Sequence, residues 1–198
     1  MSYEALESKA VTDVWDEFRE ELYADPALNL RRGDTLRARK LAAGQGRPRF
    51  PSVRRGPSRA EQLSYRLVLR RGLEVIARLP GTTVGTARGR GMSSTATTEA
   101  VLGELSSRHT RDRSSALALI RTNPAVTAWY DLAPAPAPAA PALVRGAPYA
   151  AAEAGGLLEA AEFVAYCAYQ HHARFHNRRF LWEWLPELLP AASRPLGI

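Results

Sequence analysis

Apolar side chains recur at helical spacing in the first 24 residues of the chain. Every fourth residue is apolar, which forms a single stripe along one side of the helix, and Val11 and Trp15 widen this stripe. The stripe consists of Leu6, Ala10, Val14, Phe18 and Leu22. This period predicts an amphipathic helix over residues 3–24. Asp25-Pro26 ends it, because a residue that precedes proline avoids the helical region.

A second helix has the clearest start signal in the chain. Ser58 and Glu61 have the spacing of a capping box, and the apolar pattern behind them continues to about Leu79. The expected buried face is Tyr65, Val68, Leu69, Gly72, Val75, Ile76 and Leu79. The opposite face carries Arg66, Arg70 and Arg78, with Glu74 placed between the last two.

Further helices are predicted from weaker signals. Leu36–Ala43 reads as a short basic helix with Asp34 as its N-cap and Gly44 as its terminator. Two short helices are expected at 96–107 and 111–122. Asn123-Pro124 supplies an N-cap and a first-turn proline for another at 124–132. A strongly apolar helix is expected at 157–177.

Three segments lack such a pattern. Residues 44–57, which we call the basic strap, hold three Gly, three Pro and four Arg. This composition predicts an extended segment. Residues 80–94 are expected to form a glycine-rich loop, and residues 133–148 a semi-rigid Pro/Ala spacer.

The prediction is therefore an all-α chain, since no alternation typical of strands is evident. Residues 1–132 would form a helical domain that contains the strap. The spacer 133–148 would separate it from a C-terminal helix and aromatic tail at 149–198.

Composition narrows the class of protein. The chain has 198 residues, 45% of them hydrophobic and 24% charged, which is typical of a globular protein. Cys167 is the only cysteine, so an intramolecular disulfide is excluded. Neither a secretory signal nor a membrane-length apolar run is recognisable, and a cytoplasmic location is expected.

Charge is distributed very unevenly along the chain. Residues 31–90 carry fifteen Arg and one Lys against three acids, a net charge of +13. Residues 1–30 carry −6, whereas residues 91–133 and 134–198 each balance to zero. A concentrated basic block can attract a polyanion or an acidic protein surface.

Nucleic acid is the leading partner for this block. Arginines spread over a strap, a helix and a loop could neutralise phosphates without reading sequence. The expected contact residues are Arg47, Arg49, Arg54, Arg55, Arg66, Arg70, Arg71, Arg88 and Arg90. An acidic protein partner, or a solvated surface with no partner, would explain the same pattern. The acidic first helix could also lie against the block, or simply face solvent.

Two further constellations leave alternatives open. The three short helices within 96–132 could form a helix-turn-helix, or an ordinary helical connection. His172 and His176 are four residues apart, beside His171, and could hold a metal. Without a second ligand pair in view, a partly buried histidine pair is favoured and no metal is predicted.

The aromatic tail must bury its large side chains. It would dock on the chain's own core or, as we expect after a spacer, on a neighbouring subunit. The interface residues would be Phe180, Trp182, Trp184, Leu185 and Leu188.

Motifs for catalysis or cofactors are not recognisable. The stretch GTTVGTARGRG lacks the Gly-Lys-Ser/Thr ending of a P-loop and follows a helix, where a dinucleotide fingerprint would follow a strand. We therefore predict a non-catalytic, cofactor-free subunit of a larger complex that binds the nucleic-acid backbone. The alternative is an assembly protein whose strap and tail dock other protein subunits.

Overall fold

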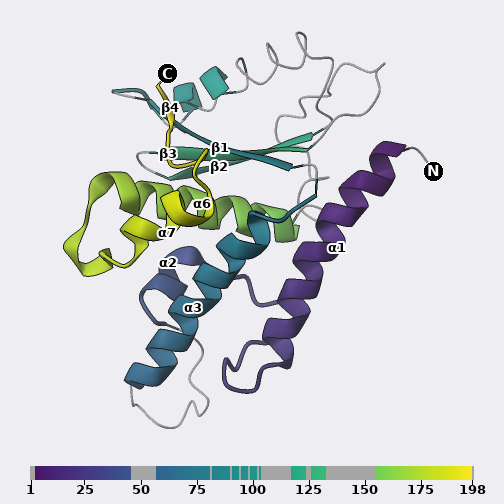
Figure 1. Cartoon of the computed structure of the whole chain (residues 1–198), viewed down its shortest axis with the longest axis vertical. Helices are drawn as coiled ribbons and strands as arrows, with labels where there is room; N and C mark the ends of the chain where they lie inside the picture. The colour runs from purple at the N-terminus through teal and green to yellow at the C-terminus, as the bar shows by residue number, and fades with distance from the viewer. Residues whose placement is uncertain are drawn as a thin grey trace.

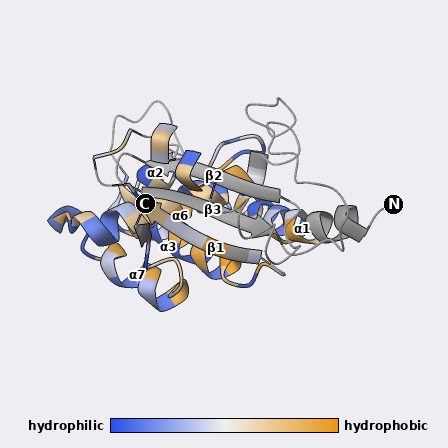
Figure 2. Ribbon diagram, turned by 90° about the horizontal axis from the view of Figure 1, so that it is seen from above, coloured by the Kyte–Doolittle hydropathy of each residue, from blue (hydrophilic) through white to orange (hydrophobic). Residues whose placement is uncertain are grey.

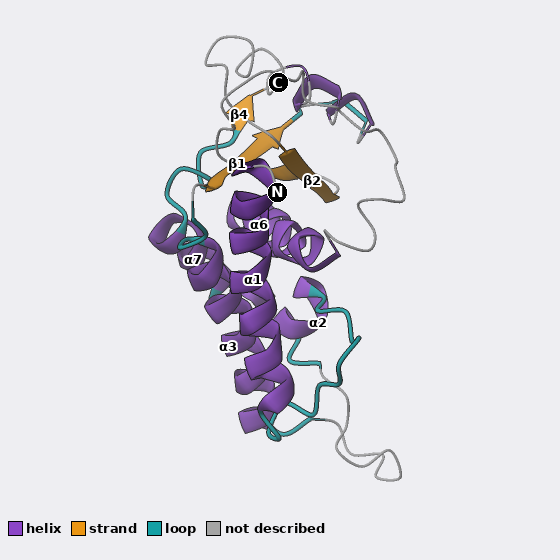
Figure 3. Ribbon diagram, turned by 90° about the vertical axis from the view of Figure 1, so that its right-hand side faces the viewer, coloured by secondary structure: helices purple, strands orange, loops and turns teal. Residues whose placement is uncertain are grey.

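A sheet lies on one side of a group of helices in the computed structural model (Figures 1 and 3). The predominantly helical character is confirmed, but the chain is not entirely helical, because four strands form this sheet. The structure describes residues 3–45, 57–80, 82–89, 91–93, 95–97, 99–101, 103, 117–123, 126–132 and 155–197.

The first helix, α1, spans Tyr3–Ala24 as predicted. Its buried face is centred on Trp15, which is completely buried and packs edge-on against the ring of Phe163. Phe18 is buried beside it, whereas Ala10 is exposed. The face is thus rotated slightly from the four-residue stripe, since a helix repeats every 3.6 residues.

The second helix, α2, is shorter than expected and spans Ala38–Ala42. Asp34 is not its N-cap: the carboxylate instead accepts a hydrogen bond of 2.9 Å from the backbone N–H of Arg31. Gly44 does follow the helix with a φ of +67°, a left-handed conformation that glycine adopts without steric cost.

The third helix, α3, spans Arg59–Ile76 and begins with the predicted capping box. The Ser58 hydroxyl accepts from the N–H of Glu61 at 3.2 Å, and the Glu61 carboxylate accepts from the N–H of Ser58 at 2.7 Å. The predicted face is buried apart from Val75, which is partly exposed, and Leu73 joins it.

The sheet has the strand order β2-β3-β1-β4. Strand β3 (Val126–Leu132) lies antiparallel between β1 (Thr82–Arg88) and β2 (Leu117–Asn123). The two-residue strand β4 (Leu196–Gly197) runs parallel to β1. Figure 2 shows the three longer strands side by side in front of the helices.

These strands correct three predictions. The loop expected at 80–94 contains β1, and the helices expected at 111–122 and 124–132 contain β2 and β3. The helix-turn-helix hypothesis is therefore wrong, because its second and third elements are strands. Of the helix expected at 96–107, the structure describes 96–97, 99–101 and 103, all helical.

Asn123-Pro124 misled the prediction because the pair suits two structures. It can cap a helix, but it also favours turns, and here Asn123 pairs with Val126 across a hairpin. Strand β1 contains three Thr and one Val, residue types that are typical of strands.

Helix α6 (Gly155–Ala173) lies between the sheet and the other helices. It contacts β2 and β3 on one side and α1, α2 and α3 on the other, so it is buried nearly all round. Helix α6 ends at Ala173, before the end predicted at residue 177. The 3-10 helix η1 (His176–Arg178) and α7 (Leu181–Leu188) follow it.

One hydrophobic core joins the segments on both sides of the expected spacer. Trp15 of α1, Leu69 of α3, Phe163 of α6 and Leu185 of α7 belong to the same cluster. The spacer itself, 133–148, lies outside the described residues.

Candidate nucleic-acid interface

Two arginines of α3, on the face predicted to carry positive charge, contact α7. The Arg66 guanidinium lies over the Phe180 ring at 4.9 Å, and that of Arg70 lies over Trp184 at 5.7 Å. Arg70 also donates to Glu187 at 2.5 Å, a contact that contributes most to raising the pKa of Arg70. Two of the predicted phosphate contacts thus hold α7 against α3.

Two acids of α1 pair with arginines of the basic block. Glu21 accepts a hydrogen bond from Arg71, and Glu20 accepts one from Arg32 at 2.6 Å. The hypothesis that the acidic helix lies against the block is confirmed for these two arginines. All four side chains are about half exposed or more, so each pair contributes only about 0–1 kcal/mol.

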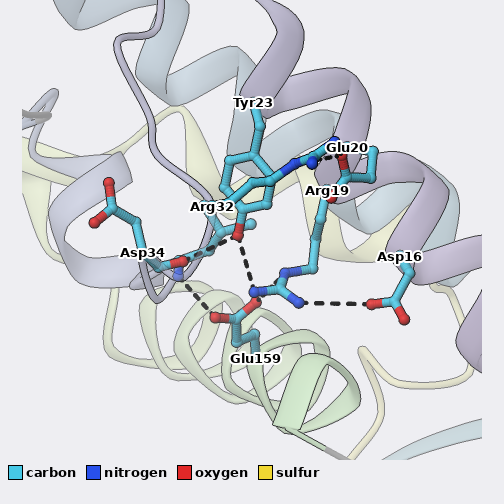
Figure 4. A network of polar contacts seen from close by, with 8 residues as sticks. Asp16, Arg19, Glu20, Tyr23, Arg32, Asp34 and Glu159 are labelled. Carbon is cyan, nitrogen blue, oxygen red and sulfur yellow. Dashed lines mark hydrogen bonds and ion pairs between the residues drawn. The ribbon is translucent and has the colours of Figure 1, made fainter.

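A buried carboxylate fastens α1 and the segment before α2 to α6 (Figure 4). Glu159 of α6 is 6% exposed and faces the Arg19 guanidinium at 3.2 Å, as an ion pair without hydrogen-bond alignment. Its other oxygen accepts the backbone N–H of Leu36 at 2.9 Å. Burial raises the pKa of Glu159, and Arg19 and the Leu36 N–H partly oppose that shift.

The network extends from Arg19 to the surface. Arg19 donates to the Tyr23 hydroxyl at 2.9 Å, and that hydroxyl donates to the backbone oxygen of Asp34 at 3.2 Å. Asp16 lies 3.5 Å from the same guanidinium. A buried carboxylate with a raised pKa can mark a reaction site. Here both oxygens face protein groups, so we assign the network a structural role.

The two ends of the basic strap lie close together. A Cβ added at Gly44 would be 2.6 Å from Cβ of Gln62, and the Gln62 side-chain amide donates to the Pro57 carbonyl at 3.1 Å. The residues between these ends, 46–56, lie outside the described part of the chain. Five of the predicted contacts therefore lie outside the described residues: Arg47, Arg49, Arg54, Arg55 and Arg90.

Exposed cations flank the ends of the strap. Arg39 and Lys40 lie on α2, and Arg59 begins α3, which contacts α2. Within the described residues, none of the three is within 4.0 Å of a carboxylate. The described carboxylates therefore do not neutralise the positive charge at the strap ends.

The aromatic tail packs on its own chain. Leu185 is completely buried, and Phe180, Trp184 and Leu188 pack against the core while partly exposed. The backbone carbonyl of Trp182 accepts a hydrogen bond of 2.6 Å from Nδ1 of His171, which must therefore carry the proton.

The histidines do not share a helical face, since α6 ends at Ala173, before His176. His172 has a lowered pKa because it is partly buried and lies near the positive charges of His171, Arg88 and Arg174. In the part of the chain that the structure describes, no cluster of three or more His, Cys, Asp or Glu could hold a metal.

A second basic surface, missed by the sequence analysis, surrounds the connection between α6 and α7. Residues 171–179 contain three Arg and three His and no acid. The net charge of residues 134–198 is zero, so counting charge over that whole segment concealed this run. A count over windows of nine residues would have revealed it. Arg88, a predicted contact, is exposed on β1 and close enough to influence His172.

The geometry thus defines a mostly helical protein with a small sheet and two basic surfaces. Comparison with protein-family models, curated proteins and solved structures found no match to this chain. None of the described helices has the length and apolar character needed to cross a bilayer.

Proposed function

We propose that this protein is a non-catalytic subunit of a larger complex that binds the nucleic-acid backbone without sequence preference. The basic strap would be its main contact surface. The proposal rests on a difference in pairing between the arginines of α3 and the cations at the strap ends. Arg70 and Arg71 of α3 are paired with acids, whereas Arg39, Lys40 and Arg59 at the strap ends have no such partner among the described residues.

Arginine suits this task because its planar guanidinium can hold two phosphate oxygens at once. The strap adds Arg47, Arg49, Arg54 and Arg55 to the three cations at its ends. Few apolar or aromatic residues accompany them, which favours contact with phosphates over recognition of bases.

The adjacent arginine pairs of the chain provide a matched experiment. Labelled single-stranded DNA, duplex DNA and RNA would be titrated at several salt concentrations with the wild type, Arg54→Gln/Arg55→Gln and Arg31→Gln/Arg32→Gln. Both double variants remove two positive charges, but only the first alters the strap.

We expect wild-type binding to weaken steeply with salt. The strap variant should lose roughly 0.7–0.9 units of log–log slope per arginine that contacts a phosphate. The control should keep the wild-type slope. No wild-type binding at low salt, or a slope near zero, would refute the proposal.

An assembly protein is the alternative, favoured by one specific observation. Leu63 and Leu67 lie four residues apart on α3 and are 56% and 51% exposed. Exposed leucines on one helical face suit a contact with a protein neighbour. Light scattering of the wild type and Leu63→Gln/Leu67→Gln tests this, because an assembly through this face would dissociate in the variant.

A further inference from the structure

The connection between α6 and α7 presents an exposed cationic surface. We call residues 171–182 the α6–α7 corner; it is the yellow-green turn at the left edge of Figure 1 and is largely hydrophilic in Figure 2. Its exposed or partly exposed cations are Arg174, Arg178 and Arg179.

Trp182 holds two of these arginines in place. The guanidinium of Arg174 lies 5.1 Å from the Trp182 ring and that of Arg179 lies 6.0 Å from it. Arg174 has a φ of +55°, a left-handed conformation uncommon for residues other than glycine. Its N–H bonds to the Gln170 carbonyl at 3.0 Å and closes the last turn of α6. Both guanidiniums therefore contact the same ring before any ligand binds.

The charge of the corner exceeds what local structure requires. Cations are stabilised at a helix C-terminus, but the helix dipole offers only about half a negative charge there. Among the described residues, no carboxylate lies within 4.0 Å of Arg174, Arg178 or Arg179. Glu183, in the first turn of α7, is exposed and makes no ion pair with them. An anionic ligand would supply the negative charge that the described carboxylates do not provide to these arginines.

An exposed ring lies within this cationic run. Phe175 is 44% exposed, with its ring centre 5.5 Å from that of Tyr169, and it is flanked in sequence by Arg174 and His176. Cations beside an exposed aromatic ring are the usual means of binding single-stranded nucleic acid, because unpaired bases stack on the ring while phosphates meet the cations.

We infer that the α6–α7 corner binds single-stranded nucleic acid. A base would stack on Phe175, and the neighbouring phosphates would contact Arg174, Arg178 and Arg179. This inference rests on the proposed function and adds to it a second surface with a preference for single strands. Duplex bases are already stacked on one another, so Phe175 could not receive them.

The test uses the full chain and a labelled oligothymidine, with a DNA duplex as the comparison. Phe175→Leu removes the aromatic face from an exposed site, and Phe175→Trp restores one. Arg178→Gln/Arg179→Gln removes two charges at the corner, and Arg31→Gln/Arg32→Gln removes two elsewhere. Circular dichroism would verify that each variant is folded.

We expect Phe175→Leu to weaken binding of oligothymidine about 5- to 150-fold and leave duplex binding unchanged. Phe175→Trp should bind like the wild type, with its added fluorescence quenched by the stacked base. Arg178→Gln/Arg179→Gln should lower the salt slope for single strands by roughly 0.7 units per lost phosphate contact, and the control pair should not.

Three outcomes would overturn the inference. If the wild type and both corner variants bind oligothymidine equally, the corner makes no contact although the proposed function stands. Equal losses on single strands and duplex in Phe175→Leu would exclude base stacking. A polyglutamate peptide that displaces oligothymidine at equal charge would assign the corner to acidic peptides. If the wild type binds no nucleic acid at low salt, the proposed function itself fails.

Discussion

Gly72 of α3 and Phe163 of α6 touch so closely that a single added carbon would not fit between them. A Cβ at Gly72 would lie 2.5 Å from Cε2 of Phe163, and both residues are buried. The glycine thus lets the two helices approach closely beside Trp15, whose ring centre is 5.7 Å from that of Phe163.

Gly72→Ala should therefore destabilise the protein. Alanine favours a helix over glycine by about 1 kcal/mol, but overpacking of a buried contact costs about 1–3 kcal/mol, and this clash is severe. We expect the free energy of unfolding in urea to fall by about 1–2 kcal/mol. Gly103→Ala, at a helical position with no atom within 4 Å of the added carbon, should leave stability unchanged or raise it.

A double-mutant cycle would locate the cause. Phe163→Leu removes the ring atoms that the new carbon meets, so Gly72→Ala should cost less in that background. If Gly72→Ala costs the same in the wild type and in the Phe163→Leu variant, the contact with this ring is not the reason for the glycine.

Loss of the Glu159 carboxylate should release α1 and the segment before α2 from α6. Glu159→Ala leaves the N–H of Leu36 without its acceptor and Arg19 without its buried partner. We expect a loss of about 2–4 kcal/mol in the free energy of unfolding, measured in urea.

Glu159→Gln is the matched variant. Its amide oxygen can still accept from Leu36, so the loss should be smaller. Because the pKa of Glu159 is raised above its ordinary 4.5, the wild type should gain stability relative to Glu159→Gln as the pH falls through the folded-state pKa. An unchanged difference between pH 7 and pH 4.5 would contradict this account.

Removal of two acids from α1 should strengthen nucleic-acid binding. Glu20→Gln/Glu21→Gln frees Arg32 and Arg71 from their ion pairs, while the free energy of unfolding should change by no more than about 2 kcal/mol. Affinity should rise, with a salt slope steeper by up to roughly 0.9 units per arginine that now meets a duplex phosphate.

The control for this change lies on the same helix. Asp13→Asn/Glu17→Gln removes the same charge from exposed acids that form no ion pair with the described residues. It should raise affinity less and keep the slope. Equal effects of the two variants would mean that only net charge matters, and not the pairing with Arg32 and Arg71.

The titration of His172 should make stability depend on pH in mild acid. Burial and nearby positive charge lower its pKa below 6.5 in the folded state, so the unfolded chain binds the proton more readily. The stability that this lowered pKa contributes is present above pH 6.5 and is lost as the pH falls through the folded-state pKa of His172. Urea unfolding at pH 7.5 and 5.0 should show a smaller loss for His172→Gln than for the wild type.

Arg88→Gln gives an independent check of the same group. This exposed substitution removes one of the positive charges that lower the His172 pKa, so the pH-dependent loss should shrink without loss of the histidine. A pH dependence identical in all three proteins would show that His172 does not contribute.

Helices with a local signal were predictable from the sequence. The limits of α1 and the capping box of α3 depend on residues within a few positions of each other, and the structure has both. The strands were missed because their pairing is not local. Strand β1 pairs with β3, whose partner residues come 40 to 50 positions later, and with β4 near the end of the chain, and nothing near Thr82 or Val126 reports these partners.

The candidate surfaces divide in the same way. The location of the +13 block, its strap and its acidic neighbour can be read directly from the sequence. The sequence could not reveal that Arg70 is committed to Glu187, because the two residues are 117 positions apart. Nor could it show that Trp182 gathers Arg174 and Arg179 from two sides of a turn.

The sequence by itself therefore determined which segments are helical by local pattern and where positive charge is concentrated. Only the tertiary structure decided which arginines are paired internally and which remain exposed, and it alone brought β1, β2 and β3 into one sheet. The physical reason is that helix caps and periodicity act over a few residues. Ion pairs, ring contacts and strand pairing instead depend on the distance in space between residues far apart in the chain.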